Sequence, residues 1–175
     1  GILSDLSADN LVCRLLLEKK NTTPLNPRDQ AMLVYAWAAF DPEGALAYAE
    51  ASGAGRRTLF LVSAGLRSWA TRDPDAALAY AGEFGGRERE LLIGGALSGW
   101  ATTDPMAAAR YTGSIEDGEL RQRSLQSIAP ALLQMGRANL TAWIQGLPDE
   151  TFRREVVAAV AGSWQNTDHA GTAAW

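Results

Sequence analysis

Apolar residues recur along this chain at helical spacing, in runs that are divided by short polar turns. The stretch at 69–80, Trp-Ala-Thr-Arg-Asp-Pro-Asp-Ala-Ala-Leu-Ala-Tyr, holds the end of one apolar run, an Asp-Pro turn and the start of the next run. The same string returns closely at 37–48 and 100–111, and in altered form at 132–143 and 164–175. Successive copies begin 31 or 32 residues apart. A fixed period of this size indicates a repeat architecture.

Turn residues divide each copy into a longer first helix and a shorter second helix. Asp41, Asp73 and Asp104 each precede a proline, and Asp caps the free N–H groups of a helix start while Pro fits its first turn. Because Pro disfavours helical geometry in the residue before it, each Asp-Pro also ends the preceding helix. The pattern predicts helices at 9–18, 27–40, 42–52, 56–71, 74–84, 87–102, 105–113, 119–134, 138–146, 149–166 and 169–175. It predicts no strands, because no run alternates with a two-residue period.

Helix pairs of this length do not bury their apolar faces alone, so neighbouring pairs must stack. We therefore expect an all-α fold, a right-handed α-α superhelix (solenoid) of about five helix-pair repeats, forming a single domain over 1–175. Aromatic residues hold equivalent positions in the copies: Trp37, Trp69, Trp100 and Trp164 in the first helices, and Tyr48, Tyr80, Tyr111 and Trp143 in the second. Their constant phase favours core packing over a platform on which a ligand stacks.

The second-helix spacing Ala76-xxx-Tyr80 is similar to the Ala-xxx-Phe pattern of tetratricopeptide-type helical repeats. The period is two residues shorter than that family's 34, and the family's first-helix Trp-xx-Leu-Gly-xx-Tyr pattern is missing. The chain more closely resembles bacterial tandem repeats built on Trp-Ala-x-x-Asp-Pro-x-Ala-Ala. This resemblance covers nearly the whole chain. It implies an α-solenoid with a protein-binding role, and it implies no catalytic residues.

Charge and motifs exclude several classes of function. The net charge of −4 gives no electrostatic reason to bind nucleic acid or an anionic membrane, and no apolar run reaches the ~18 residues of a membrane span. The single cysteine, Cys13, excludes an internal disulfide and a cysteine-based zinc site. His169 is the one histidine, and no nucleophile, phosphate-loop or zinc-protease motif occurs. We expect no enzymatic activity, cofactor or metal, and the compartment stays open.

Arginine supplies the one candidate binding pattern, with fourteen Arg against two Lys. Arginine pairs recur at the start of the later first helices, and stacked repeats would align Arg57, Arg87, Arg121 and Arg153. A row of forked donors suits a carboxylate-rich peptide or another polyanion. Acidic residues recur beside these arginines, so the alternative is a set of structural ion pairs between helices.

The sequence thus predicts a non-catalytic repeat scaffold that binds a protein or peptide of unknown identity. Two alternatives stay open: a structural or assembly module, and a fragment of a helical-toroid lyase or glycosidase. Both ends of the chain are apolar, with Ile2 and Leu3 at one and Trp175 at the other. Because terminal repeats normally carry a polar outer face, these ends predict a longer parent protein or end-to-end self-association.

Overall fold

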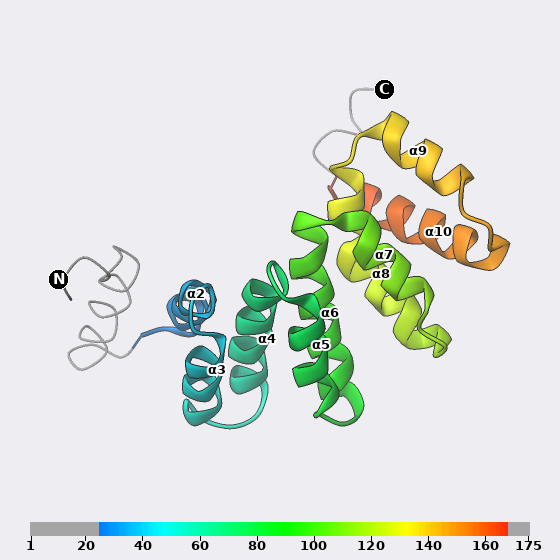
Figure 1. Cartoon of the computed structure of the whole chain (residues 1–175). Coiled ribbons are helices and arrows are strands. Elements are labelled where there is room, and N and C mark those ends of the chain that lie inside the picture. The colour runs from blue at the N-terminus through cyan, green and yellow to red at the C-terminus, as the bar shows by residue number, and fades with distance from the viewer. Residues whose placement is uncertain (1–24, 168–175) are drawn as a thin grey trace.

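A computed structural model describes residues 25–167 of the 175-residue chain. All regular structure in this range is helical, and the helices follow one another as a series of antiparallel pairs (Figure 1). The predicted helices at 9–18 and 169–175 lie outside the described residues. The helices are α2 (Pro27–Ala38), α3 (Pro42–Ala51), α4 (Arg56–Ala70), α5 (Pro74–Gly82), α6 (Gly86–Thr103), α7 (Pro105–Gly113), α8 (Gly118–Leu133), α9 (Arg137–Gln145) and α10 (Glu150–Thr167).

Side-chain caps begin the second helices of the first three pairs. In each, the carboxylate of the Asp-Pro turn accepts a hydrogen bond of 3.0 Å from the backbone N–H three residues later, and the proline occupies the first turn of the helix. These bonds satisfy donors that the helix itself leaves unpaired. The pairs are Asp41–Gly44, Asp73–Ala76 and Asp104–Ala107.

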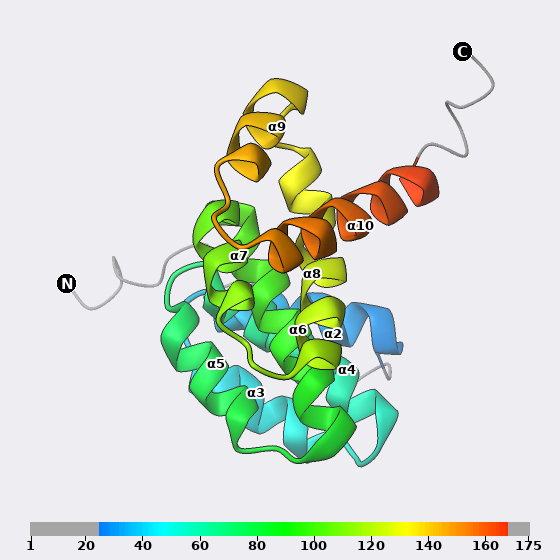
Figure 2. The same cartoon turned by 90° about the vertical axis from the view of Figure 1, so that its right-hand side faces the viewer.

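The helices lie in two layers. Each first helix packs against the next one, α2 on α4, α4 on α6, α6 on α8 and α8 on α10. Each second helix contacts its own first helix and the following one, so α3 touches α2 and α4, and α5 touches α4 and α6. In Figure 2 the second helices α3, α5 and α7 lie to the left, and α2, α4, α8 and α10 lie to the right.

The core fills the space between these layers. The first helices contribute leucine and other aliphatic side chains, and the second helices contribute mostly alanine. Alanine adds little bulk, which lets each short helix lie close to the two long helices beneath it. The fully buried leucines include Leu33, Leu46, Leu61, Leu66, Leu92, Leu97, Leu125 and Leu132, and the buried second-helix alanines are Ala45, Ala49, Ala77, Ala81, Ala108 and Ala109.

The repeated aromatic residues join the two helices of one pair. The ring centroids of Trp37–Tyr48, Trp69–Tyr80 and Trp100–Tyr111 are 5.7, 6.2 and 5.9 Å apart, within the range of favourable aromatic contacts. Five of these six rings are partly buried and pack against the core, whereas Tyr111 is 36% exposed. Trp143 packs on the core in the same way. Trp164 is 55% exposed, and its predicted second helix falls outside the described residues.

Glycines mark the places where first helices approach most closely. A Cβ on Gly99 would lie 2.0 Å from the backbone oxygen of Arg67, so α4 and α6 touch backbone to backbone there. A Cβ on Gly65 of α4 would lie 3.1 Å from the Val34 side chain of α2, and 2.8 Å from the Leu46 side chain of the second helix α3. The small residues of the second helices, Gly44 and Ala76, donate their backbone N–H groups to the capping aspartates.

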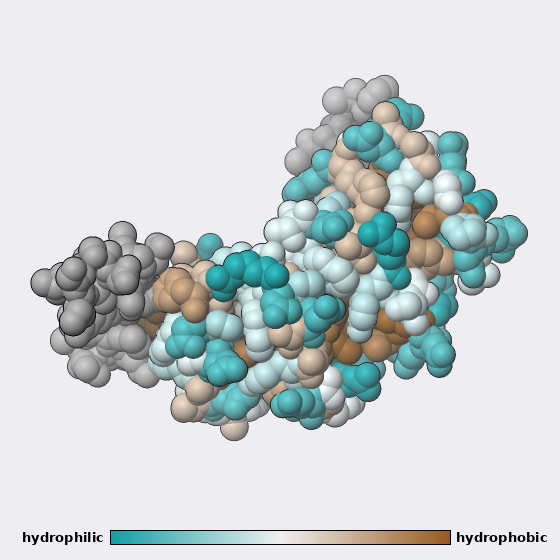
Figure 3. Space-filling view, viewed as in Figure 1, coloured by the Kyte–Doolittle hydropathy of each residue, from teal (hydrophilic) through white to brown (hydrophobic). Residues whose placement is uncertain are grey.

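The outer surface of the second-helix layer is mainly hydrophilic or neutral. Figure 3 shows this side in the orientation of Figure 1, with apolar residues confined to small areas. None of the helices between residues 25 and 167 has the length and apolar character needed to cross a membrane.

Candidate functional site

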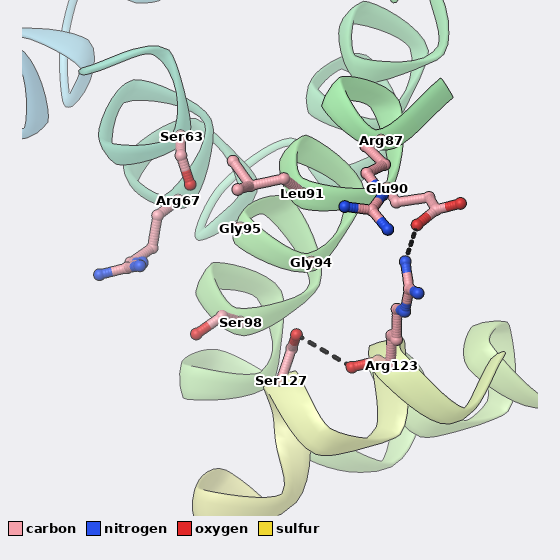
Figure 4. A pocket seen from close by; sticks show the side chains of 10 residues that line it. All are labelled: Ser63, Arg67, Arg87, Glu90, Leu91, Gly94, Gly95, Ser98, Arg123 and Ser127. Carbon is pink, nitrogen blue, oxygen red and sulfur yellow. Dashed lines mark hydrogen bonds and ion pairs between the residues drawn. The ribbon is translucent and has the colours of Figure 1, made fainter. Parts of the chain in front are cut away.

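A groove runs across the outer side of the first-helix layer, over α4, α6 and α8. Its volume is about 710 Å³, and it is open to solvent. Leu91, Gly94 and Gly95 of α6 line its centre (Figure 4). Ser63, Ser98 and Ser127 each come from a different first helix, so three helices contribute hydroxyl groups.

Equal offsets from the tryptophans that recur in the sequence explain why these residues share one surface. Ser63 and Gly94 each lie six residues before the repeated tryptophan of their helix, and Arg67 and Ser98 each lie two residues before it. Such offsets, three to four residues apart, place side chains on one face of a helix. These residues of α4 and α6 therefore share the face that lines the groove. A smaller hollow of about 320 Å³ lies between α8 and α10, with Gln126 at this six-residue offset.

The charged side chains of the groove are three arginines and one glutamate. Arg123 of α8 forms ion pairs with Glu90 of α6 and with Glu119 of its own helix. Arg67 and Arg87 are exposed, and no hydrogen bond or ion pair joins either side chain to another group between residues 25 and 167. In Figure 4, Arg67 extends from α4 on one side, Arg87 lies on the other, and Leu91, Gly94 and Gly95 lie between them.

Exposed apolar side chains lie at equivalent positions of this layer. Phe60 and Leu91, each nine residues before a repeated tryptophan, are 52% and 51% exposed. In α2, Met32 and Tyr35 hold the offsets of Gly95 and Ser98 and are 64% and 42% exposed. Large apolar side chains that stay in water indicate an interaction surface when they gather on one face.

The four arginines that the sequence analysis aligned have different environments. Arg87 lines the groove. Arg57 donates from Nε to the side-chain oxygen of Gln30 over 3.1 Å and so ties α4 to α2. Arg153 donates to the backbone oxygen of Leu147, which precedes its own helix.

Arg121 holds α8 against α10. Its Nε and a terminal nitrogen donate to the two carboxylate oxygens of Glu155 over 2.7 and 2.9 Å, and its other terminal nitrogen donates to the backbone oxygen of Ile115 over 2.8 Å. The hydrogen bond from Arg121 is the main cause that lowers the pKa of Glu155, and the same bond raises the pKa of Arg121. Such a forked pair fixes both helices in position.

The sequence analysis missed Arg67, Ser63 and Ser98. Arg67 stands alone at its offset, because the same position in the other first helices is Tyr35, Ser98, Pro130 or Gly162. The sequence does place these hydrophilic residues on one helix face, six or two residues before the repeated tryptophan. To identify that face as the groove, one must also know which face of each first helix the second helices cover.

The described residues hold no cluster of three or more histidine, cysteine, aspartate or glutamate side chains that could bind a metal ion. Comparison with known proteins found no family model that matches this chain, and it found no matching curated protein or solved structure.

Proposed function

We propose that this protein is a non-catalytic α-solenoid of about five helix pairs that binds a peptide segment of a partner protein in the first-helix groove. The observation that carries the proposal is the groove itself, where unpaired arginines, hydroxyl groups and the exposed Leu91 come together across α4, α6 and α8. The right-handed superhelix is part of the proposal and is supported by the regular packing of first helix on first helix.

The groove has the composition of a recognition surface. Its volume of about 710 Å³ lies within the 300–1,000 Å³ that is usual for ligand sites. The groove is open to solvent rather than enclosed, which suits a peptide segment that belongs to a longer partner chain. Leu91 offers apolar area whose burial contributes about 25 cal/mol per Å². Polar groups beside it would fix the position of the bound segment.

The arrangement of reactive groups supports binding over catalysis. Residues 25–167 contain no histidine, so within this part of the chain a groove serine has no imidazole to act as its base. Glu90, the one groove carboxylate, is bound to Arg123. A glycosidase needs two carboxyl groups that face each other across the substrate, and the groove contains only one.

A selection from a displayed random-peptide library tests the proposal. The wild-type protein and the variant Ser98→Trp, which fills the groove, are each used as bait. Ala79→Trp places the same side chain on the exposed side of α5 and serves as the matched control. We expect the wild type and Ala79→Trp to enrich the same peptides, and folded Ser98→Trp to lose them. Equal enrichment by all three, or by none, contradicts the proposal, and the second result favours a structural module.

A further inference from the structure

We infer that the groove selects acidic peptide segments, whose carboxylates are bound by Arg67 and Arg87 while an apolar side chain rests against Leu91. The inference rests on the proposed function and specifies the chemistry of the partner. It follows from one contrast: the whole chain carries a net charge of −4, yet the groove presents three arginines against one glutamate.

The pairing pattern of the arginines identifies which of them can bind a ligand. Arg123 already contacts Glu90 and Glu119, so its charge is balanced within the protein. Arg67 and Arg87 have no such partner among residues 25–167, and both line the groove. Elsewhere in the first-helix layer, Arg121 and Arg154 are each bound to a glutamate, whereas Arg28, Arg56 and Arg89 also lack such a partner among residues 25–167 but do not line the groove. Two unpaired guanidinium groups therefore remain where the surface is hollowed.

The geometry of the groove suits carboxylates that flank an apolar residue. The two arginines come from different helices and stand on opposite sides of Leu91, Gly94 and Gly95 (Figure 4). Gly94 and Gly95 project no side chain, and the hydroxyl oxygens of Ser127 and Ser63 lie 2.9 and 2.4 Å from where their Cβ atoms would be, so α8 and α4 pack closely on α6 between the arginines. The guanidinium group is a planar fork that can donate two parallel hydrogen bonds to one carboxylate. Ser63 and Ser98 supply hydroxyls that can bond to the peptide backbone.

The same features favour a peptide over a nucleic acid. Single-stranded nucleic acids are bound by aromatic platforms joined to a continuous basic track, and the residues that line this groove include no aromatic ring. Two unpaired arginines would neutralise about two phosphates, which gives only weak binding at physiological salt. Carboxylates, by contrast, are the geometric match for isolated guanidinium forks.

The test is a peptide selection in which the groove charge is reversed. The baits are the wild-type chain, the groove variant Arg67→Glu/Arg87→Glu, and the control Arg110→Glu/Arg137→Glu, which makes the same change of net charge on the second helices α7 and α9. A fluorescein-labelled oligouridylate RNA is titrated against all three in parallel. Circular dichroism spectra establish that each bait is helical.

We expect the wild type and the control to enrich peptides rich in Asp and Glu with a nearby Leu, Ile or Phe, and the groove variant to enrich basic peptides instead. For one selected peptide, Arg67→Gln/Arg87→Gln should weaken binding about tenfold, since each exposed ion pair contributes about three- to fivefold.

Three results would overturn the inference. Enriched peptides without acidic bias would leave the proposed function standing and reject the acidic partner. An acidic bias that survives charge reversal would place the binding site elsewhere. RNA binding that only the groove variant loses, without any acidic peptide, would assign the groove to nucleic acid. A library that yields no peptide with any bait instead contradicts the proposed function itself.

Discussion

The contact of α4 with α6 at Gly99 gives the sharpest test of the fold. A methyl group there would lie 2.0 Å from the backbone oxygen of Arg67, 2.7 Å from its carbonyl carbon and 2.8 Å from its Cα. Because all three are backbone atoms, no rotation of a side chain can relieve the overlap, and the two helices must move apart. Gly99→Ala should therefore destabilise the protein.

The magnitude follows from two opposing terms. Replacing a helical glycine with alanine contributes about 1 kcal/mol of stability, through lower backbone entropy in the unfolded chain. Overpacking a close contact costs about 1–3 kcal/mol, and a backbone contact belongs at the upper end of that range. The net loss in the free energy of unfolding should be about 2 kcal/mol.

Gly162 in α10 is the matched control for this substitution. It also lies inside a long first helix, but a Cβ there would meet no atom within 4 Å. Gly162→Ala should therefore raise stability by about 0.5–1 kcal/mol. Urea unfolding followed by circular dichroism measures both variants, with the slope of the transition compared to establish that the surface exposed is unchanged. If Gly99→Ala shifts the midpoint upward as Gly162→Ala does, the first helices do not touch as described.

Three further predictions concern the caps and the bonds between pairs. Asp73→Ala should cost about 1 kcal/mol in thermal or urea unfolding, while Asp73→Asn, which keeps a capping oxygen, should cost much less. A double-mutant cycle with Arg121→Met and Glu155→Gln should give a coupling energy of about 1–2 kcal/mol. Because folding lowers the pKa of Glu155, the coupling energy is fully present above the unfolded pKa of about 4.3 and is lost as the pH falls through the folded pKa. A coupling energy that is unchanged in strong acid would contradict this prediction. The pKa of Tyr80 is raised, mainly by burial and next by its hydrogen bond to Glu50. An ultraviolet titration should therefore show one tyrosine that ionises well above pH 10, and this step should be missing in Tyr80→Phe.

Local sequence signals were sufficient to predict the helices. The expected span 56–71 corresponds to α4 (Arg56–Ala70), and 74–84 corresponds to α5 (Pro74–Gly82), because Asp-Pro acts through hydrogen bonds and dihedral limits within a few residues. The all-helical class followed from the same signals and is confirmed for the described residues.

The site depended on contacts between helices that are distant in sequence. Arg57 and Arg121 belong to the same sequence pattern as Arg87, yet Gln30 and Glu155 from neighbouring helices bind the first two. Which arginine stays unpaired is therefore decided by packing, not by spacing. Gly99 shows the same limit. The sequence marks it as a small residue before a tryptophan, but its contact with the backbone of α4 exists only once the helices are stacked.

Crosslinking of a selected peptide tests the central claim most directly. A photoreactive amino acid replaces Ser98 in the groove or Ala79 on the exposed side of α5, and crosslinked products are located by mass spectrometry. We expect the peptide to be captured from position 98 and not from position 79. Capture from position 79 with none from position 98 would place recognition on the second-helix layer and contradict the groove as the binding site.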